Sequence, residues 1–253
     1  MKLRRRSRTR DRDPDQDPKP DQDPNRTPGS VLVPAALAPL VLVGGWSLAE
    51  SAQADSYDPL RDTLSALAGL GAAHHGIMTS ALILLGLAHL GTASLLRGAA
   101  PAGRWLQALG GAATIGVALL PLSSESDGIG HAVAAVVAFT ALALWSAFAA
   151  RADGPRVLRP VVMRSATVVL GLLVGWFAVA LVVDVLPGLA ERVAALAEAL
   201  WPLIVAWMVR ESGGGGTPPP EPEKDEPEPD EEQPPDWSPE PTAVDDRVPS
   251  TSR

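Results

Sequence analysis

The residues of this chain with the most reactive side chains form a few small groups within long apolar runs. Asp127 and His131 lie four residues apart in the segment SSESDGIGH, which separates two such runs. On a helix this spacing brings the two side chains together, so the carboxylate could orient one ring nitrogen and leave the other free. His74 and His75 begin another apolar run. Together these four residues could hold a zinc ion, which would activate a bound water as a nucleophile.

The same residues also have explanations that involve no reaction. Asp127 is expected in the first turn of a helix, where free backbone N–H groups favour a negative charge. The chain has no H-x-x-x-H or HExxH motif, and His74 and His75 would point about 100° apart on a helix. It has no cysteine, which excludes disulfides, thiolate metal ligands and a cysteine nucleophile. A serine mechanism through Ser65 and His131 is a further alternative, although no spacing brings those two residues together.

Two acids lie within the last apolar run. Glu191 and Glu198 are seven residues apart, so they share a helix face, with Glu198 about two turns deeper. If this run spans a membrane, an ionisable residue in it is costly to bury unless it is paired or hydrated, which makes Glu198 a candidate functional residue. A structural pair with Arg192 or with a histidine is the alternative. His89 lies fourteen residues after His75 and is expected near the other membrane surface, as an interfacial or packing residue.

The elements that must position these residues are membrane-spanning helices. Residues 31–209 contain several long, nearly uncharged stretches, each long enough to cross a hydrocarbon layer of roughly 30 Å. The sequence therefore predicts an all-α integral membrane protein with a bundle of six transmembrane helices. The predicted spans are Val31–Leu48, Ala72–Leu96, Arg104–Leu122, Ile129–Ala150, Val161–Val183 and Leu189–Val209. A signal peptide cleaved after Ala52-Gln53-Ala54 is an alternative for the first span.

Composition divides the chain into three regions. Residues 1–30 form a basic N-terminal tail, 31–210 the six-helix transmembrane domain, and 211–253 an acidic, Pro-rich C-terminal tail. Both tails have too little apolar surface to offset the entropy lost on ordering, so we expect them to be disordered. We expect membrane lipids as partners and no nucleic acid. Trp237, the one aromatic residue of the acidic tail, could dock a protein partner, and no particular cofactor is indicated.

The charges of the short connections predict the orientation. Basic residues dominate the N-terminal tail and the second-to-third and fourth-to-fifth connections, whereas acidic residues dominate the other three connections. Positively charged connections stay on the cytoplasmic side of a membrane. We therefore predict a multi-pass protein of the cell membrane, with both termini cytoplasmic and SSESDGIGH outside.

The first outer connection carries a helical pattern. Asp58 followed by Pro59 is typical of a helix start. The apolar residues that follow at helical spacing are Leu60, Leu64 and Leu67. This pattern predicts a short amphipathic helix on the outer face, with Asp62 and Ser65 turned away from its apolar side.

Pairs of small residues four apart predict close helix packing. Gly171 and Gly175 form such a pair in the fifth span, and Ala112 and Gly116 form one in the third. Small residues let the backbones of two helices approach closely in a membrane. We expect these pairs to make contacts within the bundle, and contacts between two copies of the chain are the alternative.

Several of these segments resemble a known family. The segment SYDPLRDTLSAL, then ALLP, and then HAVAAVVAF are similar to an uncharacterised prokaryotic six-helix family, domain of unknown function 998, over about residues 31–209. His131, Ala135 and Phe139 carry a more distant resemblance to six-helix eukaryotic autophagy modulators and GPI-anchor remodelling factors. The resemblance implies the six-helix fold and draws attention to the residues Asp58, Asp62, Ser65 and His131. It implies no reaction.

Two functions are compatible with these residues. The first is a non-enzymatic protein whose outward-facing polar pocket binds a lipid headgroup or a small solute and could transport it. Its candidate ligand-binding residues are Asp58, Asp62, Ser65, His75, Asp127, His131 and Glu198. The second is a membrane-embedded, metal-dependent lipid hydrolase that uses the four zinc candidates. The missing metal motifs favour the first function, and the sequence leaves open whether the protein is an enzyme.

Overall fold

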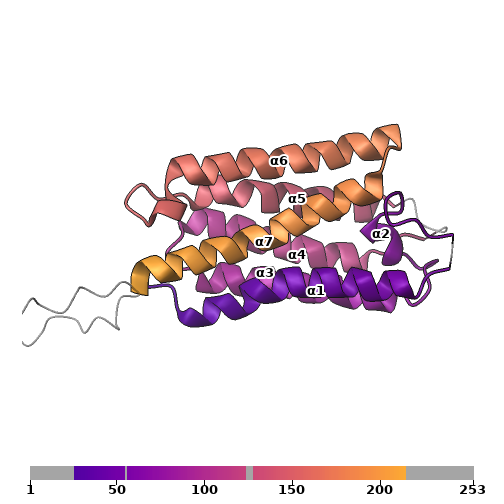
Figure 1. Ribbon diagram of the computed structural model, residues 1–253, viewed down its shortest axis with the longest axis horizontal. Helices are drawn as coiled ribbons and strands as arrows, with labels where there is room; N and C mark the ends of the chain where they lie inside the picture. Colours follow the sequence, from indigo (N-terminus) through magenta and orange to yellow (C-terminus); the bar gives the residue numbers. More distant parts are fainter. Residues whose placement is uncertain (1–25, 55, 124–127, 215–253) are drawn as a thin grey trace, which may run out of the picture. The chain divides into compact units, whose positions relative to one another are not determined.

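Helices account for nearly all the regular structure of the chain (Figure 1). The computed structural model describes residues 26–54, 56–123 and 128–214. Six long helices lie in this part: α1 (Leu32–Ser51), α3 (Gly76–Leu95), α4 (Pro101–Leu119), α5 (Ile129–Ala149), α6 (Pro160–Val183) and α7 (Pro187–Gly214). The shorter elements are α2 (Leu64–Leu67) and the 3-10 turns η3 (Gly29–Val31) and η4 (Arg156–Leu158). The predicted all-α fold is confirmed; Trp237 and most of both predicted tails lie outside the described residues.

The six long helices form a closed ring. Each packs against the next long helix along the chain, and α7 returns to pack against α1 (Figure 1). Because the connections are short, neighbouring helices run antiparallel. The bundle therefore has two ends. At the α2 end α1 finishes and α3 begins, and the opposite end carries the α3–α4 and α5–α6 connections. Since α1 takes part in this ring, it behaves as a bundle helix.

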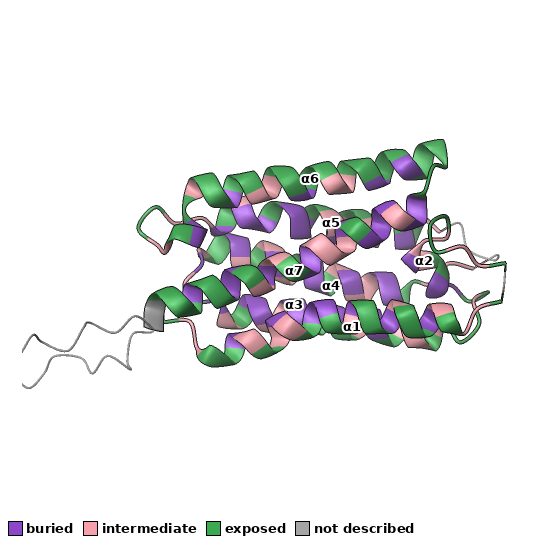
Figure 2. Ribbon diagram, in the orientation of Figure 1, coloured by how far each residue is buried: buried purple, intermediate pink, exposed green. Residues whose placement is uncertain are grey.

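The surface of the ring is that of a membrane protein. Five of the long helices, all except α4, are long and apolar enough to cross a membrane, by length and composition. α4 is less apolar, since it carries Arg104 and Gln107 and is rich in glycine. Large apolar side chains face outward around the bundle, most of all on α6, where Val182 is 86% exposed (Figure 2). Such a surface needs a lipid environment, so the chain is an integral membrane protein.

Two glycines bring α4 and α5 into close contact. A Cβ on Gly103 would lie 2.3 Å from the backbone nitrogen of Ala149, and one on Gly110 would lie 2.6 Å from Cγ of Leu142. In each helix the two positions are seven residues apart, so they lie on one face two turns apart. These contacts fix an antiparallel register between α4 and α5.

The glycine pair that the sequence singled out does not make such contacts. A Cβ on Gly171 or Gly175 would meet nothing within 4 Å, and both residues are exposed on α6. The predicted bundle contact of this pair is therefore wrong. Hydropathy and spacing do not show which side of a helix faces its neighbours, and α6 turns this side away from α5 and α7. In the other pair, Gly116 approaches Ala134 on α5, while Ala112 is exposed.

The first connection folds differently from its predicted helix. A single helical turn begins at Leu64 and not at Pro59, because Thr63 caps it by accepting a hydrogen bond from the Ala66 backbone N–H at 3.1 Å. The Asp58 backbone N–H donates to the Asp62 carboxylate at 2.8 Å, which closes a turn before the helix.

One span boundary also moves. α3 starts at Gly76, four residues after the predicted start of the second span. His74 has φ 51°, in the left-handed region that interrupts a helix.

Candidate functional site

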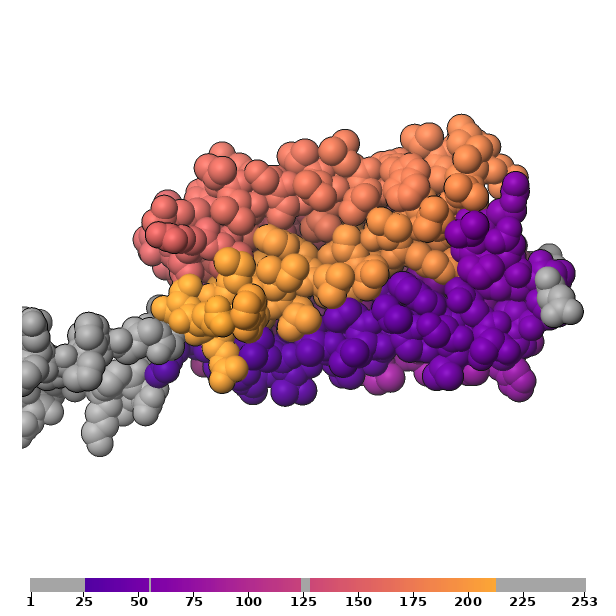
Figure 3. Space-filling view, viewed as in Figure 1, coloured from indigo at the N-terminus to yellow at the C-terminus, as the bar shows by residue number. Residues whose placement is uncertain are grey.

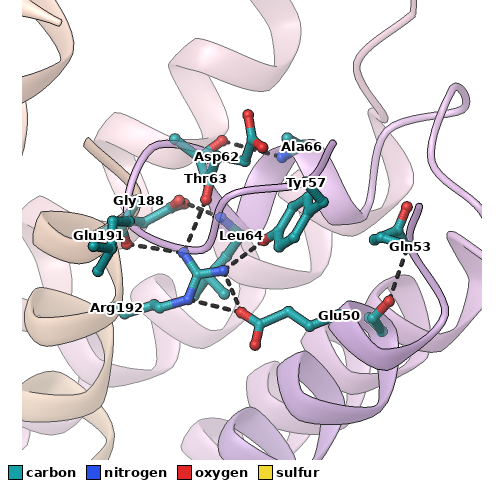
Figure 4. A network of polar contacts seen from close by, with 12 residues as sticks. Glu50, Gln53, Tyr57, Asp62, Thr63, Leu64, Ala66, Gly188, Glu191 and Arg192 are labelled. Carbon is teal, nitrogen blue, oxygen red and sulfur yellow. Dashed lines mark hydrogen bonds and ion pairs between the residues drawn. The ribbon is translucent and has the colours of Figure 1, made fainter. Parts of the chain in front are cut away.

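Glu191 joins α7 to the short helix α2. Its carboxylate accepts hydrogen bonds from the Leu64 backbone N–H at 2.5 Å and from the Ser65 hydroxyl at 3.1 Å (Figure 4). The first backbone N–H groups of a helix have no partner within the helix, and a carboxylate there is also favoured by the helix dipole. A side chain 127 positions away in sequence thus supplies a cap for α2.

Arg192 ties three segments together beside this cap. Its guanidinium donates to the Glu50 carboxylate at the end of α1 and to the Tyr57 hydroxyl at 2.5 Å (Figure 4). It also donates to the backbone carbonyls of Asp62 at 2.9 Å and Gly188 at 3.0 Å. Burial raises the pKa of the Tyr57 phenol, while the nearby guanidinium opposes that rise. The phenol is therefore neutral at physiological pH and accepts a hydrogen bond from Arg192.

Gly188 allows the first connection to lie directly on α7. A Cβ at this position would lie 2.4 Å from the carbonyl oxygen of Asp62 and 2.7 Å from that of Pro59. Next to it, the Leu189 backbone N–H donates to the Leu60 carbonyl at 3.0 Å. Figure 3 shows the result, with the first connection packed against the start of α7 at the α2 end.

A cavity lies inside the ring beneath α2. Its volume is about 50 Å³, enough for a few water molecules or a small group, and it is lined by side chains of α1, α2, α3, α4, α5 and α7. The polar and aromatic lining residues are Ser65, His89, Thr114, Phe139, Glu191 and Glu198. A separate open depression at the α2 end, of about 710 Å³, is lined by Ala66 and Leu67 of α2. α2 therefore separates this open depression from the buried cavity.

Two ionisable side chains of the cavity have unused hydrogen-bonding atoms. Oε1 of Glu198 and Nδ1 of His89 are buried and have no partner among the described residues. Glu198 is only 2% exposed and His89 only 1%. Buried polar atoms of this kind are rare, and one inside a membrane is costly, so each calls for a bound partner.

A comparison with models of known protein families identifies the family of this chain. The family model described as "Protein of unknown function (DUF998)" matches residues 36–208, which is more than half of the sequence. The chain belongs to the DUF998 family. No curated protein and no solved structure matches it. The matched region contains all six long helices except the ends of α1 and α7, so the cavity and the Arg192 network both belong to the DUF998 domain.

The structure does not gather the zinc candidates of the DUF998 domain. The described residues contain no group of three or more His, Asp or Glu side chains that could hold a metal ion, and Asp127 lies outside them. Nδ1 of His131 lies 2.9 Å from the Leu120 carbonyl oxygen at the end of α4, so the ring ties two helix ends together. His74 is exposed in a turn, and His75 lies at the start of α3, where its buried Nδ1 has no partner among the residues that the structure describes.

The other predicted ligand-binding residues divide between the cavity and the first connection. Ser65 and Glu198 line the cavity. Asp58 accepts from the Leu60 backbone N–H at 2.9 Å, and Asp62 accepts from the Asp58 N–H, so both shape the turn before α2. The alternative that Glu198 forms a structural pair with Arg192 is wrong, because Arg192 pairs with Glu50.

Sequence reasoning missed His89 and Thr114 as cavity residues. The sequence predicts His89 near the far membrane surface, but the residue lines the cavity, at a point where a Cβ on Gly111 of α4 would lie only 2.9 Å from the His89 Cβ. A histidine within the apolar run ILLGLAHLG was the available signal. The sequence allows the position of His89 along its helix to be estimated, but not the side of the helix that faces the other helices.

Proposed function

We propose that the DUF998 domain binds a small organic cation with N–H donors, such as a protonated amine or a guanidinium group, in the buried cavity. The observation that carries this proposal is the Glu198 carboxylate, which lines the cavity and has one oxygen without a partner in the described part of the chain. A buried carboxylate is stabilised by a cation that also donates hydrogen bonds to it. A cationic ligand would supply both.

The other polar groups of the cavity also favour a donor ligand. The Thr114 hydroxyl donates its proton to the Gly110 carbonyl at 2.9 Å, and the Ser65 hydroxyl donates to Glu191 at 3.1 Å. Each hydroxyl oxygen keeps lone pairs that can accept a hydrogen bond from a ligand. Phosphate or carboxylate ligands would instead meet Glu191 and Glu198 as like charges.

Phe139 adds an aromatic surface to the same cavity. Its ring packs against Phe177 of α6 with the ring centres 5.2 Å apart, which fixes its orientation. A cation near an aromatic ring gains roughly 0.5–2 kcal/mol from the ring's quadrupole. The acids, the hydroxyl oxygens and the aromatic ring of the cavity therefore all favour a small organic cation as the ligand.

The size of the cavity favours a free solute over a lipid headgroup. About 50 Å³ accommodates an ammonium or guanidinium group, and the polar part of a phospholipid is much larger. An ethanolamine headgroup presents the same N–H chemistry, so lipid and free solute must be separated by experiment.

Replacing Glu198 with glutamine is expected to weaken guanidinium binding at least about tenfold, because the charged acceptor is lost while the shape is kept. The measurement is calorimetric titration with millimolar guanidinium, using full-length protein in nanodiscs of phosphatidylcholine. The matched control is Glu211→Gln, which makes the same change at an exposed position near the end of α7. Its affinity should stay within about twofold of wild type, as expected for an exposed charge.

The same variants distinguish the two sources of the cation. If guanidinium does not bind, but phosphatidylethanolamine raises the thermal midpoint of the wild type and not that of Glu198→Gln, the cation belongs to a lipid. If neither ligand acts, or if Glu198→Gln binds as well as the wild type, the proposal is wrong.

For the orientation, we propose that the α2 end faces the outside and that both termini lie in the cytoplasm. The strict alternation of acidic and basic connections supports this orientation. Since the chain has no cysteine, a single introduced cysteine reports its own side of the membrane. In intact cells a membrane-impermeant maleimide should label Ser56→Cys at the α2 end, and should label Arg97→Cys only after permeabilisation. The reverse labelling pattern would overturn the orientation.

A further inference from the structure

Two more buried side chains of the bundle have unused polar atoms. Both amide atoms of Gln107 on α4 and the indole nitrogen of Trp145 on α5 have no hydrogen-bond partner among the described residues. Both residues are 0% exposed and belong to the long helices of the ring. Neither lines the cavity, so the proposed ligand site does not account for them.

The register of α4 and α5 places these two residues at one level. Gly110 packs on Leu142, and the two helices run antiparallel. Gln107 lies three residues beyond Gly110 towards the opposite end, and Trp145 lies three residues beyond Leu142 in the same direction. The amide and the indole therefore lie at the same depth on neighbouring helices, with no hydrogen bond between them.

This polar pair lies directly beyond the cavity. Leu142 forms part of the cavity wall, and Trp145 is one helical turn further from α2. On α4, Thr114 lines the cavity and Gln107 lies seven residues further along the same face, about 10 Å away. The unpartnered groups thus continue from Glu198 and His89 towards the opposite end of the bundle.

The opposite end is closed by apolar side chains. Trp145 packs there in a buried cluster with residues from several helices, among them Val31, Leu96, Leu158, Met163 and Val205. At the other end, Leu64 and Ser65 of α2 cover the cavity. The structure is therefore closed on both sides of the cavity, and Gln107 and Trp145 place unused polar atoms between the cavity and the apolar cluster.

We infer that the DUF998 domain moves its cationic ligand across the membrane, and that Gln107 is the acceptor that the ligand meets after Glu198. The inference rests on the proposed function and extends it from binding to transport. The Gln107 carbonyl accepts N–H donors without a full charge, so it stabilises the cation but holds it less tightly than a carboxylate. A transport path needs sites of this kind, which are favourable to enter and weak enough to leave.

The test is uptake of radiolabelled guanidinium into phosphatidylcholine vesicles that contain the purified full-length protein. Guanidinium stays charged at neutral pH, so it crosses protein-free vesicles slowly. Gln107→Leu, which keeps the volume and removes the polar atoms, should lower uptake at least about tenfold while calorimetric affinity changes less than about twofold. Gln53→Leu is the matched control at the α2 end, and its uptake should match that of the wild type.

Gln53 suits this role because its amide is fully bonded to the backbone of Ala49 and Ala73, away from the cavity. If Gln107→Leu does not fold, Trp145→Phe removes the indole N–H of the same pair while keeping an aromatic ring, and it should also slow uptake. Uptake by Gln107→Leu within about twofold of wild type would overturn the role of Gln107, since loss of one acceptor is worth more than that. Guanidinium binding by the wild type without uptake would overturn transport and leave the proposed function standing, whereas absence of binding would remove the proposed function itself.

Discussion

Replacing Arg192 with methionine is expected to destabilise the folded protein by about 3–5 kcal/mol, as measured by its unfolding in detergent mixtures. Arg192 is 9% exposed, and its guanidinium donates to the Glu50 carboxylate, the Tyr57 hydroxyl and two backbone carbonyls. Methionine has a similar length but offers no donor. The Glu50 carboxylate would then be left partly buried without its cation, which is the costly part of breaking such a pair.

The control for this prediction is Arg61→Met in the same connection. Arg61 lies 3.9 Å from Asp58, and both side chains are largely exposed. Exposed ion pairs contribute about 0–1 kcal/mol, so this variant should unfold nearly as the wild type does. In the double variant Glu50→Gln/Arg192→Met the loss should be smaller than the sum of the single losses. Equal stability of Arg192→Met and Arg61→Met would show that the network does not hold α1, the first connection and α7 together.

Replacing Gly103 with alanine is expected to destabilise the protein by about 2 kcal/mol or more, through overpacking between α4 and α5. The new Cβ would lie 2.3 Å from the Ala149 backbone nitrogen and 2.4 Å from its Cα. Backbone atoms cannot rotate away as a side chain does, so the two helices must separate. That movement would also strain the hydrogen bond from the Ala100 N–H to the Ala149 carbonyl, which is 3.0 Å long.

The matched variant, Gly171→Ala, should instead raise the stability of the folded protein slightly. A Cβ there meets nothing within 4 Å, and alanine favours a helix over glycine by up to about 1 kcal/mol. Unfolding of both variants under identical detergent conditions gives the comparison. If Gly171→Ala is the more destabilised of the two, α6 makes a contact at that face with another molecule, or the α4–α5 contact is looser than the structure shows.

The helices could be predicted because their signal is local. Five of the predicted spans begin within three residues of a helix start in the structure, since apolar runs and Pro or Gly boundaries are read along the chain itself. The predicted start of the second span was wrong because one residue, His74, adopts a left-handed conformation that interrupts the helix. The predicted start of the short helix in the first connection was wrong for a related reason. The Thr63 cap and the turn closed by the Asp62 carboxylate place its first residue at Leu64, and not at Pro59.

The candidate site could be predicted only in part. Glu191 and Glu198 share a face of α7, as their spacing requires, and both line the cavity. The sequence did not show that Arg192 would turn to Glu50, because that choice depends on α1 lying next to α7. For the same reason the sequence predicted an interfacial or packing role for His89, although the residue lines the same cavity from α3.

The all-helical membrane architecture and the six long helices could be predicted from the sequence, since they depend on the length and polarity of single segments, and the family could be predicted from short motifs. Which polar side chains meet could be seen only in the folded bundle. That outcome depends on the rotation and register of each helix, which close contacts such as Gly103 on Ala149 set across the bundle. Once those contacts are made, Glu191 caps α2, Arg192 binds Glu50, and Glu198 and His89 line one cavity with atoms left to bind a ligand.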